Sequence, residues 1–250
     1  MKFFGIPANE GALGKNNGCE EAPAFLSKLF RVNIEALSLP KNDFAEQQEA
    51  LFCKASKLFL HQEEEKFVFF GGTHDITFSL FKAFKQKHKR GKLLIFDAHA
   101  DSDEGLSTVS HEDFVRALID FKIAKPQDVC VVGLRKVYNS EKSFVKKSGI
   151  TFISASDVHK NFPRVCAFVE EFASDSAGLF VSFDVDVLSS SLMKATGYSP
   201  SGGLSFKETK TLLDLALPTA DALDIAEFNP KKISLKEDLL LKNLFGKYFS

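Results

Sequence analysis

The chain has 250 residues, with 32 Lys and Arg against 33 Asp and Glu, so its formal net charge is −1 with histidine neutral. This near-balance excludes the basic surface of a nucleic-acid-binding protein and a polybasic membrane anchor. The apolar runs are too short for a membrane-spanning helix, and the N-terminus turns polar too early for a signal peptide. Widely spaced cysteines are typical of reduced thiols, and the four are Cys19, Cys53, Cys130 and Cys166. We therefore expect a cytoplasmic protein that binds neither nucleic acid nor membrane.

Short apolar runs bounded by turn residues recur along the chain and predict buried strands. In chain order they are Lys2–Ile6, Val32–Leu37, Lys66–Phe70, Lys92–Phe96, Asp128–Val132, Ile150–Ile153, Gly178–Phe183 and Ala222–Ala226. Apolar residues at helical spacing predict helices over Ser79–Lys89, Phe162–Phe172 and Phe206–Leu217. This alternation, with no linker between its parts, predicts a single α/β domain over residues 1–250 with helices on both faces of a sheet.

Polar clusters follow three of the predicted strands, at the strand ends where function concentrates in such folds. In the first, Asp97, His99 and Asp101 alternate with alanine after Lys92–Phe96. Positions i, i+2 and i+4 of an extended backbone share one face, so we expect these three side chains to converge. A buried carboxylate is costly unless it is paired or bound to a metal. The pattern favours a metal site, and the alternative is a polar loop.

The other two clusters are weaker signals by themselves. Asp184 and Asp186 follow Gly178–Phe183 as a pair of carboxylates at i and i+2, although Asp184 alone is also compatible with a strand-end cap. His74 follows a Gly71-Gly72 turn, where a single histidine is more often a cap or a core residue than a ligand.

Together the three clusters supply two imidazoles and four carboxylates, all at strand ends. One divalent ion does not use six such ligands comfortably, whereas two ions with bridging carboxylates do. Oxygen-rich ligation with one imidazole per ion suits Mn²⁺ better than Zn²⁺. Two ions roughly 3.5–4 Å apart lower the pKa of a bridging water and present it as hydroxide.

The sequence resembles the ureohydrolases, the family of arginase, agmatinase and formimidoylglutamase, and its layout is closest to arginase. Four segments carry the resemblance, in order: Gly71-Gly72-Thr73-His74, Asp97-Ala98-His99-Ala100-Asp101, Ser182-Phe183-Asp184-Val185-Asp186 and Asp224-Ile225-Ala226-Glu227-Phe228-Asn229-Pro230. The resemblance spans nearly the whole chain. It implies a three-layer α/β/α domain with a parallel sheet of about eight strands. It also implies two Mn²⁺ per chain and hydrolysis of a guanidino C–N bond by metal-bridging hydroxide, with release of urea.

The resemblance also assigns ligands. One ion takes His74, Asp97, Asp101 and Asp184, and the other takes Asp97, His99, Asp184 and Asp186. Asp97 and Asp184 then bridge the two ions. Members of the family commonly form trimers or hexamers, so the resemblance implies a homo-oligomer acting on a small guanidino substrate.

Two further residues match positions with a role in the family's reaction. Glu227 corresponds to the acidic residue that grips the guanidinium, a role suited to paired charge-assisted hydrogen bonds, and its alternative is a strand-end salt bridge. His111 resembles the histidine proposed to shuttle protons to the leaving amine, as a near-neutral pKa allows. Its alternative is a residue at a helix start.

The sequence departs from the family pattern at the positions that read the substrate's tail. In the segment Gly133–Tyr138, Lys136 and Tyr138 occupy two positions that are acidic in arginase, and the Tyr138 position meets the α-amino group of arginine. Asp103, two residues beyond Asp101, is a candidate acidic contact from another direction. Substrates left open are therefore arginine, agmatine and guanidino acids, and we expect arginine to be a poor one.

Other departures lie near the expected metal centre. Thr73 and Asp75 replace the usual Asp and Ser around His74, and Ser189-Ser190-Ser191 replaces an Asp-Pro. The alternatives to a guanidino hydrolase are a formimidoylglutamase, a deacetylase-like amide hydrolase, and a catalytically idle metal-binding regulatory relative.

Overall fold

The computed structural model describes residues 1–40, 43–61, 65–105 and 108–249. Within these ranges eight strands form one sheet in the order β2-β1-β3-β8-β7-β4-β5-β6, and every neighbouring pair is parallel. The strands are β1 (Lys2–Ile6), β2 (Glu35–Ala36), β3 (Phe67–Gly71), β4 (Lys92–Phe96), β5 (Val129–Leu134), β6 (Thr151–Ser154), β7 (Leu179–Asp184) and β8 (Ala222–Ala226). The predicted parallel α/β sheet is confirmed.

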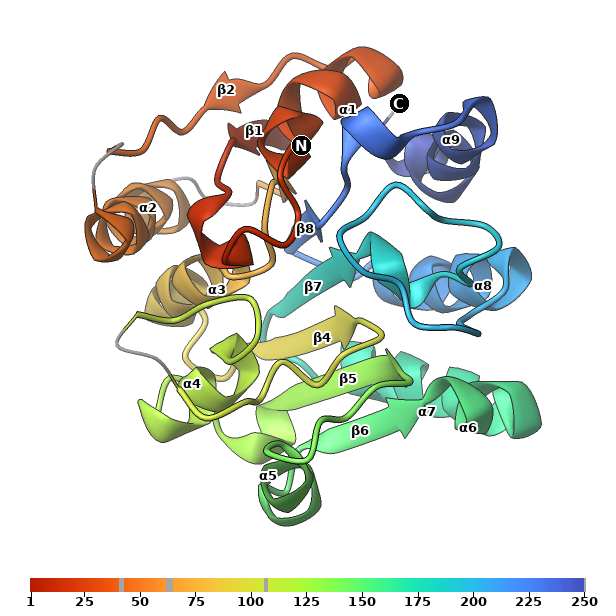
Figure 1. Ribbon diagram of the computed structural model, residues 1–250. Coiled ribbons are helices and arrows are strands. Elements are labelled where there is room, and N and C mark those ends of the chain that lie inside the picture. Colours follow the sequence, from red (N-terminus) through yellow and green to blue (C-terminus); the bar gives the residue numbers. More distant parts are fainter. Residues whose placement is uncertain (41–42, 62–64, 106–107, 250) are drawn as a thin grey trace.

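Helices cover both faces of the sheet, which gives the three layers seen in Figure 1. One face packs against α2 (Phe44–His61), α3 (Ile76–Lys87) and α4 (Phe114–Asp120). The other packs against α1 (Ala22–Phe30), α6 (Ala155–Lys160), α7 (Phe162–Ser174), α8 (Phe206–Ala216) and α9 (Leu235–Phe249). The short helix α5 (Lys142–Lys147) brings Phe144 against the first of these two cores. Among the described residues no helix is both long enough and apolar enough to cross a membrane.

Most predicted elements lie within two or three residues of the observed ones, and the largest difference is at the sheet edge. The apolar run Val32–Leu37 forms only the two-residue strand β2, in which both residues are exposed. An edge strand pairs on one side only, so less of its apolar pattern is buried. Helices α1, α2, α5, α6 and α9 were not predicted from the sequence.

Phenylalanines fill both cores. All of the largest fully buried side chains among the described residues are phenylalanines, as expected from their positions in strand-like and amphipathic runs. Phe59 meets Phe84 edge-on at 5.4 Å between ring centroids, and Phe183 meets Phe245 edge-on at 5.1 Å. Such pairs add to the stabilisation that burial of these large apolar surfaces provides.

The four central strands β3, β8, β7 and β4 end at the same edge of the sheet, and the segments that follow them meet there. Gly72 shows how closely these segments approach, because a Cβ at this position would lie 1.8 Å from the carbonyl oxygen of Ala8. The Gly72 N–H donates to Ile6 O at 3.1 Å, and its carbonyl accepts from Glu227 N at 2.7 Å. These bonds join the ends of β1, β3 and β8.

Candidate active site

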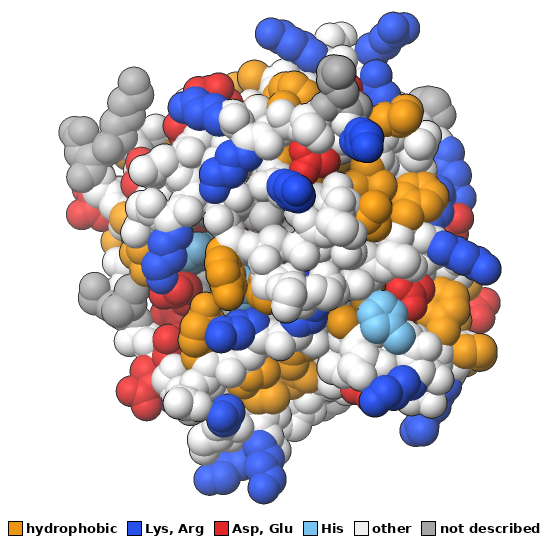
Figure 2. Space-filling view, turned by 45° about the vertical axis from the view of Figure 1, so that its right-hand side comes forward, with side chains coloured by type: hydrophobic (Ala, Val, Ile, Leu, Met, Phe, Trp, Pro, Cys, Tyr) orange, Lys and Arg blue, Asp and Glu red, His pale blue; other side chains and the backbone are white. Residues whose placement is uncertain are grey.

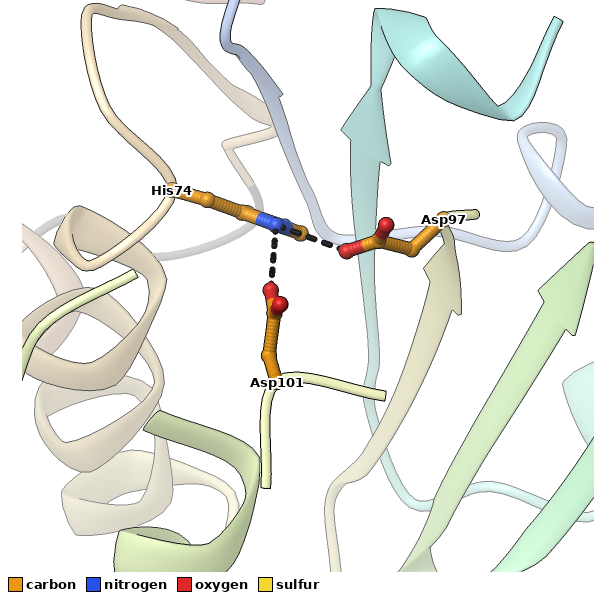
Figure 3. Close-up of side chains that lie close together, drawn as sticks. All are labelled: His74, Asp97 and Asp101. Carbon is orange, nitrogen blue, oxygen red and sulfur yellow. Dashed lines mark ion pairs between the residues drawn. The ribbon is translucent and has the colours of Figure 1, made fainter. Parts of the chain in front are cut away.

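Three predicted ligands form a tight buried group at the ends of β3 and β4. His74 points from the segment before α3 toward the end of β4, as Figure 3 shows. Its Nδ1 lies 3.0 Å from Asp97 Oδ2 and 3.2 Å from Asp101 Oδ2. A third carboxylate oxygen, Asp184 Oδ2 from the end of β7, lies 3.6 Å from the same nitrogen. One imidazole nitrogen therefore faces oxygens from three carboxylates.

A second group adjoins the first and shares Asp97 with it. His99 Nδ1 lies 2.8 Å from Asp186 Oδ2 and 3.5 Å from Asp97 Oδ1. Asp97 thus directs one carboxylate oxygen to each group, since its Oδ2 faces His74. Both groups have the composition of metal sites. The structure brings all six predicted ligands together, and the sharing of Asp97 fits a bridging carboxylate.

The residues converge, but the predicted reason, an extended backbone that places alternate residues on one face, was wrong. Strand β4 ends at Phe96, and Asp101 has φ +45°, so the segment from Asp97 is not extended. Likewise Asp186 lies in the 3₁₀ turn η4 (Val185–Val187), and β7 ends at Asp184. The side chains meet because the chain turns sharply after each strand. A non-glycine residue at positive φ is strained and persists where the surroundings hold it.

Backbone amides hold three of the carboxylates in place. Asp97 Oδ1 accepts from His99 N at 2.7 Å, and Asp184 Oδ1 accepts from Asp186 N at 2.7 Å. Asp186 Oδ1 accepts from Ala98 N at 3.0 Å and so joins the β7 segment to the β4 segment. In Asp184 and Asp186 one oxygen is held in this way and the other faces an imidazole of the site, whereas Asp97 Oδ1 is held by His99 N and also lies 3.5 Å from His99 Nδ1.

The charges show that this region attracts a cation. Burial raises the pKa of Asp184, and repulsion from Asp186 and Asp97 raises it further. Burial by itself lowers the pKa of His74, but Asp101 and Asp97 hold it well above its usual range. Asp97 is also buried, yet the two imidazoles beside it hold its pKa well below the usual value. Carboxylates this close repel one another unless positive charge lies between them.

The donor set fits a pair of divalent ions. Among the described residues, the buried Nδ1 of His74 makes no hydrogen bond, although three carboxylate oxygens surround it. A buried polar atom without a partner is costly, and a cation between the nitrogen and the oxygens satisfies all of them. Four carboxylates and two imidazoles form an oxygen-rich set of the kind that suits Mn²⁺.

Glu227 and His111 lie together beside this centre. Glu227 follows β8 at φ +60°, and its Oε1 accepts from His74 N at 2.9 Å. The same oxygen lies 3.2 Å from His111 Nδ1, while Asn16 Nδ2 donates to Oε2 at 2.8 Å. Both side chains are largely enclosed, and their contact is an ion pair after the end of β8, as the alternative for Glu227 expected. His111 does precede α4, but Asp113 is the residue at the N-cap.

Their mutual contact sets their charges. Burial raises the pKa of Glu227, but the His111 imidazole more than offsets this and lowers it below the usual value. Burial lowers the pKa of His111, and the hydrogen bond to Glu227 outweighs it, so that the pKa rises to about 8. The Nε2 of His111 is buried without a hydrogen-bond partner among the described residues. That nitrogen is therefore free to exchange a proton with a bound molecule.

A pocket of about 540 Å³ opens onto these groups. Histidine side chains are visible in a hollow at the left of Figure 2, between acidic and basic side chains. The lining residues include His74, His99, Asp101, Asp103, His111, Tyr138, Asp184, Asp186 and Glu227. All of the predicted site residues except Asp97 thus line one pocket, and Asp97 lies beneath it with 1% of its surface exposed.

The outer part of the pocket differs from the sequence-based expectation. Lys136, which occupies a position that is acidic in arginase, places its Nζ 4.9 Å from the centroid of the Tyr138 ring and is not a lining residue. The cation that does line the pocket is Lys15, which forms an ion pair with Glu112. Glu141 also lines it, and this buried carboxylate accepts from Tyr138 N at 2.7 Å.

The departures near the centre have a structural account. Thr73 and Asp75 are both buried, and the Thr73 hydroxyl donates to Asp75 Oδ1. Burial raises the pKa of Asp75 to about 6. The serines Ser189–Ser191 lie outside the pocket lining, and Ser189 N donates to Leu204 O at 2.9 Å. They hold the loop after η4 by local hydrogen bonds.

Several supporting residues were missed from the sequence because their partners are distant in the chain. Asn16 holds Glu227 from 211 residues away. Arg135 donates to the carbonyls of Asp186, at 2.7 Å, and Val187, at 2.8 Å, and so fixes the turn that carries a predicted ligand. The available signal was the position of both segments at strand ends, since Arg135 directly follows β5 and Asp186 comes soon after β7.

The fold and the site define an α/β protein with a buried centre rich in carboxylates at the carboxyl edge of a parallel sheet. A model of the Arginase family matches residues 3–238. The chain therefore belongs to the arginase family. The arginase of Plasmodium falciparum (isolate 3D7) is 22% identical over 182 residues, which cover 64% of this chain and 44% of that relative. This chain accordingly spans less than half of that relative's length.

Solved structures show the same fold. The arginase from Bacillus subtilis superposes with a TM-score of 0.84 at 19% identity, covering 100% of this chain and 98% of that one. The formimidoylglutamase from Bacillus subtilis superposes with a TM-score of 0.87 at 18% identity, covering 100% and 87%. At such identities the likeness concerns the fold, so the choice of substrate rests on the residues of the pocket.

Proposed function

We propose that this protein is a manganese-dependent hydrolase that cleaves a guanidino C–N bond and releases urea. The observation that carries the proposal is the pair of carboxylate–imidazole groups sharing Asp97, with the Glu227–His111 pair beside them in one pocket. Membership of the arginase family supports it. We also propose that residues 1–250 form one domain and that the protein assembles as a homo-oligomer, a trimer or a hexamer. The four cysteines are free, which is typical of reduced thiols, and we propose a cytoplasmic location.

The residues present would hold two divalent ions. His74, Asp97, Asp101 and Asp184 would hold one, and Asp97, His99, Asp184 and Asp186 would hold the other. When bound, such ions lower the pKa of water and supply a nucleophile at neutral pH.

Glu227 is the proposed anchor for the guanidinium. Its three protein hydrogen bonds leave acceptor capacity on the carboxylate, whose two oxygens offer about four lone-pair sites. A planar guanidinium beside a carboxylate makes charge-assisted hydrogen bonds, which are directional and strong. Glu227 would therefore orient the guanidinium carbon above the predicted metal centre.

His111 is the proposed proton carrier. In the hydrolysis, the oxygen of water bonds to the guanidinium carbon, and the bond from that carbon to the tail nitrogen breaks. The electron pair of the broken bond goes to the nitrogen, which takes a proton and leaves as an amine, while the added oxygen gives up its hydrogen as it becomes the C=O oxygen of urea. With a pKa of about 8, His111 is largely protonated at neutral pH, and its Nε2 has no hydrogen-bond partner in the described part of the chain, so it suits delivery of that proton.

The outer pocket indicates which tails fit. Glu112 is paired with Lys15, and Glu141 accepts hydrogen bonds from Ser102 N at 3.0 Å and from Tyr138 N. Tyr138 brings no charge to the position where arginase presents an aspartate. Asp103 lines the pocket and is the acidic side chain left to meet a cationic tail.

We expect L-arginine to be a poor substrate relative to agmatine or guanidinobutyrate. A hydrogen bond to a charged group contributes roughly 1.5–3 kcal/mol, so losing the aspartate contact costs arginine roughly ten- to a hundred-and-fifty-fold in kcat/KM. Urea release measured after Mn²⁺ loading, across arginine, agmatine, guanidinobutyrate and guanidinopropionate, tests this. If kcat/KM for arginine exceeded that for every other compound by tenfold or more, the protein would instead have the specificity of an arginase. Formamide release from formimidoylglutamate without urea from any guanidino compound would replace the proposed activity, and no turnover of any of them would favour a regulatory relative.

Glu227→Gln tests the guanidinium anchor. The amide keeps the size of the side chain but loses its charge, so we expect kcat/KM to fall by roughly ten- to a hundred-and-fifty-fold. Bound Mn²⁺ should remain at the wild-type level, because Glu227 is not among the predicted ligands. Glu49→Gln, at an exposed glutamate of α2 paired with Lys82, is the matched control and should keep full activity. Loss of metal in Glu227→Gln would show that the residue supports the centre instead.

A further inference from the structure

A chain of hydrogen bonds lies behind His74, on the side away from the carboxylates. Asp224 on β8 and Ser182 on β7 are paired neighbours in the sheet, and Thr77 on α3 faces them. All three are completely buried. His74 Nε2 lies 2.8 Å from Ser182 Oγ, and Ser182 Oγ lies 2.7 Å from Asp224 Oδ1. A buried carboxylate within a sheet is costly, so its position requires a reason.

The direction of each hydrogen bond follows from counting hydrogens. An ionised carboxylate only accepts, and each hydroxyl has one hydrogen to donate. Ser182 gives its hydrogen to Asp224 Oδ1, and Thr77 gives its own to Asp224 Oδ2 at 2.8 Å. Ser182 Oγ therefore accepts from His74, whose Nε2 must carry a hydrogen. An imidazole that binds a metal ion is neutral and has one N–H, so with that hydrogen on Nε2 the lone pair lies on Nδ1, the nitrogen that faces Asp97 and Asp101.

We propose that Asp224, acting through Ser182, is a positioning residue that fixes the Nε2–H form of His74 and keeps its Nδ1 available to a divalent cation. Partners of this kind orient a ligating imidazole and typically change metal affinity by about 10–100-fold when they are removed. The inference rests on the two-ion centre of the proposed function. It concerns only the ion on the His74 side, because His99 contacts none of these three residues.

Four variants separate this role from simple packing. Ser182→Ala removes the acceptor for His74. Asp224→Asn replaces a carboxylate by an amide of the same shape with no charge and one acceptor oxygen, which weakens the hold on the Ser182 hydrogen. The double variant joins these two changes. Thr77→Val is the matched control, since it removes an equally buried hydroxyl that contacts Asp224 but not His74.

Mn²⁺ titration, with free ion and the spin-coupled pair followed by electron paramagnetic resonance, gives the readout. The wild-type protein is titrated first. Binding of fewer than two Mn²⁺ per chain would contradict the proposed function itself, and this result is distinct from the outcomes that test the role of Asp224. We expect Ser182→Ala to weaken one of the two ions by about 10–100-fold and to replace the coupled spectrum by that of a single Mn²⁺ at sub-saturating metal. Asp224→Asn should weaken the same ion by about tenfold, and Thr77→Val by less than about threefold.

The double variant decides whether Asp224 acts through Ser182. If it does, Asp224→Asn weakens the ion no further once Ser182 is alanine, since interacting residues are not additive. Full additivity, or equal losses in Thr77→Val and Ser182→Ala, would overturn the inference in favour of a packing role. Unchanged affinity in Ser182→Ala would overturn it outright. Thermal unfolding of each metal-free variant shows which variants are folded. If Ser182→Ala does not fold, Asp224→Asn still tests the inference, because it is the variant closest in shape to the wild-type protein.

Discussion

Asp97→Asn is expected to abolish turnover, because this one residue serves both groups of predicted ligands. Its Oδ2 lies 3.0 Å from His74 Nδ1, and its Oδ1 lies 3.5 Å from His99 Nδ1. Asparagine keeps an oxygen for the hydrogen bond from His99 N but offers one neutral oxygen in place of a charged pair. Each proposed ion then loses a charged ligand, and with it the means of supplying a nucleophile at neutral pH.

The measurements are bound Mn²⁺ per chain after reconstitution and urea release on the best substrate of the panel. We expect about two ions in the wild-type protein and fewer than one in Asp97→Asn. Asp120→Asn is the control, since it changes an exposed carboxylate on α4 whose ion pair is with the nearby Arg116, and it should change neither quantity. Two tightly held ions in an inactive Asp97→Asn would contradict the bridging role and leave Asp97 a different part in the reaction.

His111→Ala is expected to lower kcat by about 10²–10⁴-fold while bound Mn²⁺ stays at the wild-type level. The residue contacts Glu227 and none of the six predicted ligands, so its removal should not disturb the metal centre. His159→Ala, at an exposed histidine paired with Glu208, is the matched control and should keep wild-type activity. Wild-type kcat in His111→Ala would show that His111 is only a residue of the turn before α4.

The pH dependence gives His111 a second signature. Its pKa rises to about 8 in the folded protein, above the ordinary value near 6.5, because Glu227 accepts its hydrogen. As a proton donor it is lost as pH rises through about 8, so wild-type kcat should fall on that alkaline limb and the limb should be missing in His111→Ala. The same raised pKa means that protonated His111 stabilises the fold fully below about pH 6.5 and loses this contribution as pH rises through 8. Thermal unfolding across this range, compared between the two proteins, measures that difference.

The sequence by itself determined the architecture and which residues gather at the site. Apolar runs such as Lys92–Phe96 and Ala222–Ala226 are buried on both faces, and their short length and flanking turn residues favour strands of a parallel sheet. Because neighbouring parallel strands end at the same edge of the sheet, the polar residues that follow them were expected to lie close together. The motifs of the family then identified Glu227 and His111, which spacing alone did not single out.

Only the tertiary structure decided how those residues are held and what else lines the pocket. The alternation rule for extended backbone failed after β4 and β7, because sharp turns stabilised by amide–carboxylate bonds replace strand there. Lys15 lines the pocket although it was not predicted to do so. Lys136, which was expected among the residues that read the substrate's tail, lies outside the lining and over the Tyr138 ring. The role proposed for Asp224 depends on its contact with Ser182, 42 residues earlier in the chain. Hydrogen-bond direction and side-chain contact depend on distances between residues far apart in sequence, and periodicity and spacing carry no record of those distances.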